Sequence, residues 1–189
     1  RIPVPQFAWR EEDMKYMLCF FPWIGAVIGG CIYLWEQACI FFNLGAICRT
    51  ALCAAIPLLI TGGFHADGFL DVMDARHSYQ PRERKLEILK DSHIGAFAVI
   101  MFAIYGLLYL GAFSEIKDGN LMKAVCSGFF LSRCLCGISV LSFPLAKREG
   151  MLYYTVSNAR KGSVKILLYL QGFVCMGCMI YTAGLSGLL

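Results

Sequence analysis

The chain has 189 residues, of which 58% are hydrophobic and 16% are charged, and its mean hydropathy is +0.62. Soluble domains usually carry about 25% charged residues, so the composition excludes an ordinary soluble domain and indicates a chain that folds in lipid. The net charge of +4 comes without a long basic run, which argues against a nucleic-acid partner.

Five uncharged or nearly uncharged stretches are long enough to cross a membrane, since about 20 apolar residues cover a hydrocarbon core of about 30 Å. They cover approximately residues 17–35, 46–63, 94–113, 121–143 and 166–189. We therefore predict an all-α fold, a polytopic integral membrane helical bundle of about five transmembrane helices. One membrane domain is expected to include residues 1–189.

A polar segment, residues 64–93, separates the second and third predicted spans. It contains six acidic and five strongly basic residues, a density of both signs that is unusual for a plain connection. Pro81 is suited to the first turn of a new helix, and Leu86 and Leu89 give the residues after it one apolar side. We predict a short interfacial helix over residues 82–92.

The positive charges predict the orientation of the chain. Thirteen Lys and Arg residues lie in the N-terminal segment, in 64–93 and in 144–165, against three in the alternate loops. Cytoplasmic loops carry the excess of Lys and Arg, so the N terminus and the acidic segment are expected on the cytoplasmic side. The sequence thus predicts a multi-pass protein of a bacterial or archaeal cell membrane.

Three carboxylates give the polar segment its chemistry. Asp67, Asp71 and Asp74 have the spacing i, i+4, i+7, which places them on one face of a helix. A divalent cation would offset their repulsion, and oxygen ligands favour magnesium, calcium or manganese. His65 precedes them and is either a hydrogen-bonded structural residue or a ligand of the site. The alternative is that the acids form a solvated helix face.

Further candidates lie outside this triplet. Glu87 and Asp91 are also one turn apart and either complete the site or pair with Arg84 and Lys90. Arg133 lies about ten residues inside an apolar span, where an ionisable residue is a functional candidate. Its guanidinium suits bidentate phosphate binding, and the alternative is a structural ion pair with a carboxylate.

The motifs resemble those of the cobalamin synthase family. Residues 61–74 read Thr-Gly-Gly-Phe-His-Ala-Asp-Gly-Phe-Leu-Asp-Val-Met-Asp, similar to the family signature His-x-Asp-Gly-x-x-Asp-x-x-Asp. Residues 82–97, the Arg-Ile-Pro-Val-Pro start, the Ser132-Arg133 pair and residues 143–150 resemble further family motifs in the same order. On these residues the chain is identified as a member of the family.

The resemblance implies a late step of cobalamin assembly. The adenosylcobinamide-phosphate group of adenosylcobinamide-GDP would pass to α-ribazole or its phosphate, with release of GMP. It also implies Mg²⁺ as the cofactor and membrane lipid as the surroundings, and it leaves open a homo-oligomer or an assembly with other corrinoid enzymes. Of the residues, Asp67 and Asp71 would bind the metal, and Asp74 would be a third ligand or the base. His65 competes for the role of base. Phosphate contacts would come from Arg133, Lys90, Arg84 and Lys147.

The chain departs from the family pattern at several positions. Lys90, His93 and Lys147 stand where arginines are expected, and Lys lacks the planar fork of Arg. The family's Gly-Gly-x-Thr-Gly-Asp motif does not occur before Leu189, and the first residue is Arg1, so we expect a sequence truncated at both ends. Three alternatives stay open: an inactive fragment, a CDP-alcohol phosphotransferase-like enzyme, and a cation transporter.

Overall fold

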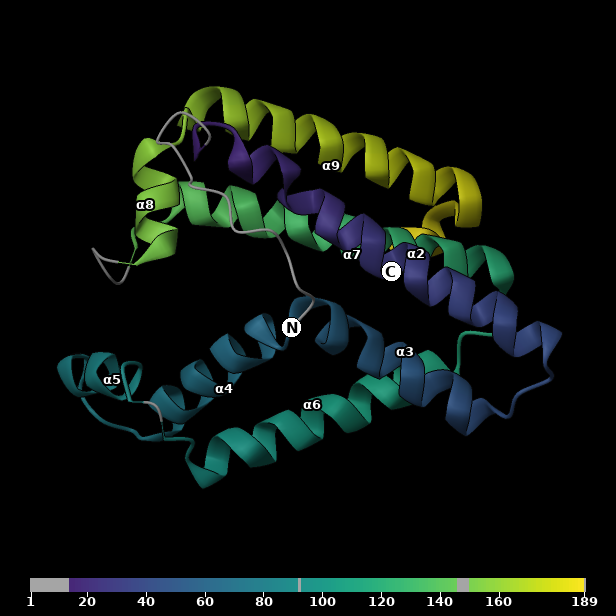
Figure 1. The fold of residues 1–189 in the computed structure, drawn as a ribbon, viewed down its shortest axis with the longest axis horizontal. Helices are drawn as coiled ribbons and strands as arrows, with labels where there is room; N and C mark the ends of the chain where they lie inside the picture. Colours follow the sequence, from purple (N-terminus) through teal and green to yellow (C-terminus); the bar gives the residue numbers. More distant parts are fainter. Residues whose placement is uncertain (1–13, 92, 146–149, 189) are drawn as a thin grey trace. The chain divides into compact units, whose positions relative to one another are not determined.

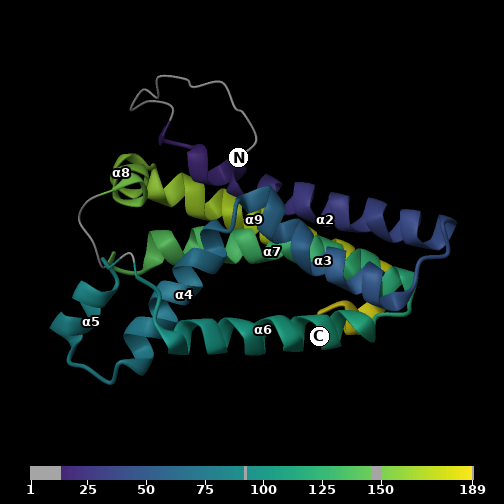
Figure 2. The ribbon, with the colours of Figure 1, turned by 60° about the horizontal axis from the view of Figure 1, so that its bottom comes forward.

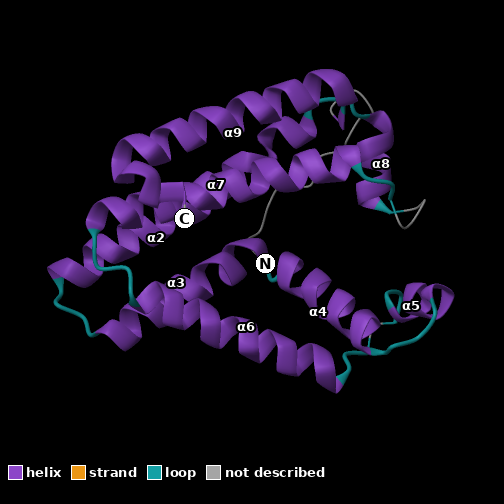
Figure 3. Ribbon diagram, turned by 180° about the vertical axis from the view of Figure 1, so that it is seen from behind, coloured by secondary structure: helices purple, strands orange, loops and turns teal. Residues whose placement is uncertain are grey.

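A computed structural model describes residues 14–91, 93–145 and 150–188, and these residues form helices joined by short loops (Figures 1 and 3). The part of the chain that it describes contains no strand, which confirms the all-α prediction. The elements are α2 (Met17–Phe41), α3 (Ala46–Thr61), α4 (Phe64–His77), α5 (Arg82–Ile88), α6 (Ala96–Ser114), α7 (Gly119–Ser142), α8 (Met151–Asn158), α9 (Lys161–Ala183) and the 3-10 helix η1 (Gly184–Leu188).

Among the described residues, four stretches are long and apolar enough to cross a membrane by themselves: α2, α6, α7, and residues Lys161–Gly187, which include α9. A fifth candidate consists of α3 and α4 together, which pass the same test as a pair but are bent by 95° at their junction. The chain is thus a multi-pass membrane protein. The predicted second span differs from the structure, because α3 ends at Thr61 and a second helix follows the bend.

The chain divides into two compact units. The first consists of Arg1–Leu34 and Lys117–Leu189, and the second of Trp35–Ile116. Each unit is described by itself below, and the single membrane domain expected from the sequence stays a prediction.

The first unit is built on close contact between α2 and α7. Gly25 and Gly29 lie one turn apart on α2, and a Cβ atom at either would overlap the α7 backbone, at the carbonyl groups of Phe129 and Cys126 respectively. Residues later in α2 thus face residues earlier in α7, so the two helices are antiparallel. Small residues let helix backbones approach closely in membranes, and this pair has the Gly-x-x-x-Gly spacing.

A methyl group at Gly29 is expected to destabilise this contact. In Gly29→Ala the new Cβ meets a backbone carbonyl that cannot move without displacing α7, so the free energy of unfolding should fall by about 1–3 kcal/mol. Gly30→Ala is the matched control, since nothing lies within 4 Å of a Cβ built there. Thermal unfolding in detergent would measure both. Equal stability of the two variants would contradict the close α2–α7 contact.

α8 and the start of α9 close one end of the first unit. Val156 of α8 lies in one buried cluster with Leu18 of α2, Leu141 of α7 and Val164 of α9. The backbone N–H of Arg160 donates to the carbonyl of Lys15 at 3.2 Å. The sequence did not predict α8, because its eight residues are too few for a clear apolar pattern.

The second unit contains the helices that carry the polar segment. α3 and α4 both pack against α6: α4 lies along its N-terminal half and α3 along the remainder (Figure 2). The Phe69 ring of α4 lies 5.6 Å from the Tyr105 ring near the middle of α6, whereas Asp74 meets Gly95 at the N-terminal end. The polar segment therefore begins beside an apolar helix, where the sequence predicted an extramembrane connection.

Candidate active site

Two consecutive glycines make the bend that starts α4. Gly62 ends α3 with φ of 62°, and Gly63 precedes α4 with φ of 77°. Both values lie in the left-handed region, which residues with a Cβ adopt at a cost of about 1–2 kcal/mol. The Gly-Gly pair therefore fixes the direction in which the acidic helix leaves α3.

Replacing Gly63 tests this bend. Gly63→Ala is expected to lower the free energy of unfolding by about 1 kcal/mol, because nothing crowds the site and only the backbone strain acts. Gly68→Ala, inside α4 and equally uncrowded, should raise it by about 0.5–1 kcal/mol. Chemical unfolding in mixed micelles would compare the two variants, and effects of the same sign would contradict the conformation of the bend.

Aromatic contacts fix one side of α4 on α6. Phe69 lies against Phe102 and Tyr105, with ring centroids 6.4 and 5.6 Å apart. One end of α4 is held by His77, whose ring stacks on Phe97 at 5.9 Å. The His77 Nδ1–H donates to the Met73 carbonyl at 2.8 Å, since a carbonyl oxygen can only accept. The acidic helix thus has a defined side toward α6.

Asp74 connects the acidic helix to the start of α6. Its carboxylate accepts a hydrogen bond from the backbone N–H of Gly95 at 3.1 Å, and Gly95 is the N-cap residue of α6. A Cβ at Gly95 would overlap this carboxylate, so a larger residue there would displace the Asp74 side chain. The two conspicuous sequence motifs, one at 61–74 and one at 82–97, therefore meet at this contact.

The other two carboxylates are each two positions from Phe69, so spacing directs them away from the ring contacts with α6. Asp67 is in the first turn of α4 and exposed, and Asp71 is half-buried one turn later. An acid in the first turn is stabilised by the helix dipole. His65, two positions before Asp67, lies on the opposite side of the helix by spacing, and its ring is 5.6 Å from that of Phe64.

The triplet does not form a ready three-ligand metal centre. No group of three His, Cys, Asp or Glu side chains within the described ranges is arranged to hold a metal ion. Asp74 is engaged with Gly95, while Asp67 and Asp71 remain one turn apart on one side of α4. Asp74 was predicted as a third ligand or the base, and the structure adds that its carboxylate accepts a hydrogen bond from the backbone N–H of Gly95.

The acids predicted for the second half of the site have local partners. Glu87 pairs with Arg84 on the exposed side of α5. Asp91 accepts hydrogen bonds from the backbone N–H of His93 at 3.0 Å and from its ring Nδ1–H at 2.6 Å. These bonds hold the pKa of the Asp91 carboxyl below its usual range, the backbone bond contributing most. Lys90 is exposed at the end of this segment.

The remaining predicted phosphate ligands lie elsewhere. Arg133 is half-buried in α7, in the first unit, with its guanidinium 5.9 Å from the centre of the Phe21 ring. Lys147 lies outside the described residues.

The structure adds an ion pair that the sequence did not predict. Arg49 Nε lies 2.9 Å from Glu36 Oε2, its guanidinium also donates to the Ile116 carbonyl, and Trp35 Nε1–H donates to the Arg49 carbonyl at 3.1 Å. Glu36 is only 8% exposed. The presence of two opposite charges in neighbouring apolar stretches could have predicted this ion pair. With Glu36 paired, α2 continues to Phe41, past the predicted end at Trp35.

The fold and site define a class: a multi-pass, all-helical membrane protein with a row of carboxylates on the second half of a bent helix pair. A family model described as cobalamin-5-phosphate synthase matches residues 1–189, and the chain belongs to this family. The membership confirms the resemblance found in the motifs. It argues against the CDP-alcohol phosphotransferase-like and transporter alternatives.

Relatives of the chain are named adenosylcobinamide-GDP ribazoletransferase. The protein of Lachnoclostridium phytofermentans is 44% identical over 173 residues, which cover 90% of this chain and 66% of the relative. That of Clostridium perfringens strain ATCC 13124 is 30% identical over 189 residues, 100% of this chain and 75% of the relative. That of Clostridium botulinum strain Eklund 17B is 39% identical over 119 residues, 63% and 47% respectively. The chain thus spans between about half and three quarters of these relatives. No solved structure matches it.

Proposed function

We propose that the protein transfers the adenosylcobinamide-phosphate group of adenosylcobinamide-GDP to a hydroxyl of α-ribazole or α-ribazole phosphate. The acceptor oxygen forms a bond to the phosphorus on the cobinamide side of the diphosphate. The bond from that phosphorus to the bridging oxygen breaks, GMP leaves with this oxygen, and the acceptor's proton passes to a base. The names of the relatives support this reaction.

The observation that carries the proposal is the position of the acidic helix. α4 is held on α6 by Phe69, His77 and Asp74, and Asp67 and Asp71 lie one turn apart on this fixed helix, the first exposed and the second half-buried. Phosphoryl transfer depends mainly on positioning and charge neutralisation, and carboxylates on a fixed helix are suited to both. We assign Asp74 the role of a positioning residue.

Asp67 and Asp71 fit a magnesium ion. Mg²⁺ usually binds one or two carboxylates, keeps several waters and shares the substrate's phosphates, so a third protein ligand is not required. When bound, the ion would neutralise charge on the diphosphate. Calcium prefers six to eight oxygen ligands, more than this pair offers.

Two of the proposed phosphate contacts, Lys90 and Arg84, belong to the segment that follows α4. Lys90 is exposed and available to a diphosphate. Arg84 would have to leave Glu87 to make such a contact. We retain Arg133 and Lys147 as proposed contacts on the family resemblance alone. We retain His65 as the proposed proton acceptor on the family resemblance alone, and loss of the acidic limb of the pH–rate profile in His65→Gln would test it.

The orientation is part of the proposal. The excess of Lys and Arg at the N terminus, in 64–93 and in 144–165 supports a cytoplasmic position for α4 and α5. A nucleotide substrate made in the cytoplasm would then reach the acids directly.

Membrane vesicles that contain the full-length protein provide the test. Incubation with adenosylcobinamide-GDP and α-ribazole should release GMP and form a phosphodiester-linked corrinoid, and vesicles without the protein serve as the control. Chelation of divalent ions should stop the release, and added Mg²⁺ should restore it. Release that does not depend on the acceptor would contradict the transfer reaction, and release after thorough chelation would contradict the role of the metal.

A further inference from the structure

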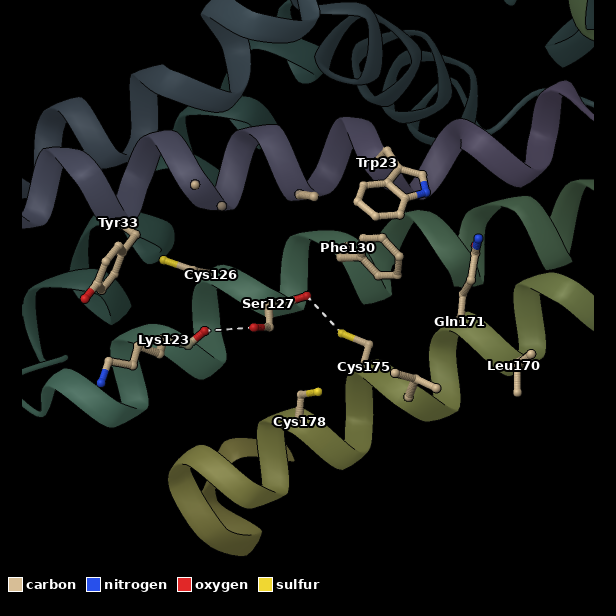
Figure 4. A pocket seen from close by; sticks show the side chains of 14 residues that line it. Trp23, Tyr33, Lys123, Cys126, Ser127, Phe130, Leu170, Gln171, Cys175 and Cys178 are labelled. Atoms are coloured by element: carbon tan, nitrogen blue, oxygen red, sulfur yellow. Dashed lines mark hydrogen bonds between the residues drawn. The ribbon is translucent and has the colours of Figure 1, made fainter.

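The first unit contains a groove whose lining residues all belong to that unit. It is formed by α2, α7 and α9 and has a volume of about 770 Å³ (Figure 4). Pockets for small ligands usually measure about 300–1,000 Å³, so the groove is large enough for a ligand. The reaction proposed above assigns it no role.

The wall of the groove is apolar and open to the surroundings. Trp23, Leu170 and Val174 line it, and they are 58%, 57% and 60% exposed. All three helices belong to candidate membrane spans, so this surface lies where lipid is the solvent. An acyl chain can cover such a wall without loss of hydrogen bonds, whereas an amide-rich ligand would leave polar groups without partners.

The groove has a polar end. Gly25 opposite Phe129 and Gly29 opposite Cys126 set an antiparallel register, which brings Tyr33 of α2 to the level of Lys123 on α7. Both residues line the groove, and Figure 4 places the phenol and the ammonium at the same end. Lys123 is in the second turn of α7, the level at which a Lys side chain reaches the membrane interface.

The polar contacts at this end leave N–H groups of the Lys123 ammonium available to a ligand. Lys123 Nζ donates to Asn120 Oδ1 at 3.3 Å, which occupies one of its three N–H groups. The neighbouring acid, Asp118, accepts from the backbone N–H groups of Asn120 and Leu121 at 2.6 and 3.0 Å. These bonds hold the pKa of the Asp118 carboxyl below its usual range.

We propose that this groove binds an anionic phospholipid. An acyl chain lies along Trp23, Phe130 and Leu170, and the phosphate of the headgroup contacts Lys123 and the Tyr33 hydroxyl. A cation at one end of an otherwise apolar groove selects an amphiphile with a negative head. The bound lipid would fill the groove between the three helices of the first unit.

Fluorescence quenching in nanodiscs tests the proposal, because Trp23 forms part of the groove wall. The probe is phosphatidylglycerol with brominated acyl chains, compared with phosphatidylcholine carrying the same chains. Subtracting the signal of Trp23→Phe isolates the response of Trp23 from the chain's other two tryptophans. Quenching should occur at an about fivefold lower mole fraction of the anionic lipid, the preference expected from one lysine at the interface.

Two variants separate headgroup binding from chain binding. Lys123→Gln should remove the preference for phosphatidylglycerol, whereas Lys161→Gln, exposed at the N-terminal end of α9, should keep it. Gly30→Leu adds a side chain to the lining of the groove, at a position where nothing lies within 4 Å of a Cβ, and should weaken quenching by both lipids. Gly111→Leu on α6 is the matched control: it is equally uncrowded, does not line the groove and should leave quenching unchanged.

Each contrary result would overturn the proposal. Equal quenching of Trp23 by the two lipids would mean ordinary boundary lipid. A preference that survives Lys123→Gln, or quenching unchanged in Gly30→Leu, would place the lipid elsewhere. Mass spectrometry of the purified full-length protein should find phosphatidylglycerol retained through detergent exchange. Retention of a corrinoid in its place would exclude the lipid.

Discussion

Asp71→Asn is expected to lower GMP release by at least about 100-fold, the usual effect of losing one group that stabilises developing charge. Asparagine keeps the size of the side chain and the helical position but removes the negative charge that would hold the ion. Asp67→Asn should behave in the same way, because the two acids lie one turn apart on the same side of α4. GMP release by vesicles, measured against added Mg²⁺, would show the defect as a higher metal requirement.

Two further substitutions make this prediction specific. Asp118→Asn removes a carboxylate that caps α7 in the first unit, and asparagine is an equally good cap, so activity should be unchanged. Asp74→Asn keeps an oxygen that accepts from Gly95 N–H and should retain much more activity than Asp71→Asn. Equal losses in Asp74→Asn and Asp71→Asn would contradict the separate role of Asp74 and return it to the metal ligands.

Glu36→Gln is expected to be the most destabilising of the substitutions considered. It leaves the Arg49 guanidinium beside a neutral amide in a largely buried position, where the side chains are 11% and 21% exposed. Breaking a buried ion pair by removing one charge costs about 3–5 kcal/mol. Unfolding in mixed micelles would measure the loss. The helix α2 should then end closer to Trp35, the end expected from hydropathy alone.

A double substitution separates the charge from the packing. Glu36→Leu with Arg49→Met removes both charges and keeps apolar volume, so it should recover most of the stability lost in Glu36→Gln. Conversely, a double variant as unstable as the single one would mean that the Arg49 contact with the Ile116 carbonyl, rather than the ion pair, stabilises this end of the unit.

The fold could be predicted from the sequence where hydropathy alone decides it. The stretches around α6 and α7 are apolar throughout, and their predicted bounds differ from the observed ones by two residues or fewer at each end. Hydropathy failed where a long-range contact decides the structure. A charged residue at Glu36 predicts the end of a span, whereas in the structure its carboxylate pairs with Arg49 and α2 continues. The α2–α7 contact depends on glycines, which hydropathy does not single out.

The candidate site was predictable to the same degree. Spacing placed Asp67, Asp71 and Asp74 on one helix, and the structure confirms that helix. Spacing could not show the structural contact of Asp74, because its partner is the backbone N–H of Gly95, 21 residues later in the chain. For Glu87 the nearby Arg84 was one of two interpretations, and the structure contains that pair.

The bend between α3 and α4 has a consequence for the bilayer itself. α3 has 16 residues, about 24 Å of helix, which is shorter than a hydrocarbon core of about 30 Å. α4 then turns by 95° and runs beside the apolar N-terminal half of α6, so the exposed Asp67 lies level with residues of that helix. With α6 as a membrane span, water would have to reach α4 at this depth, and the diphosphate of the proposed substrate would react below the plane of the lipid headgroups.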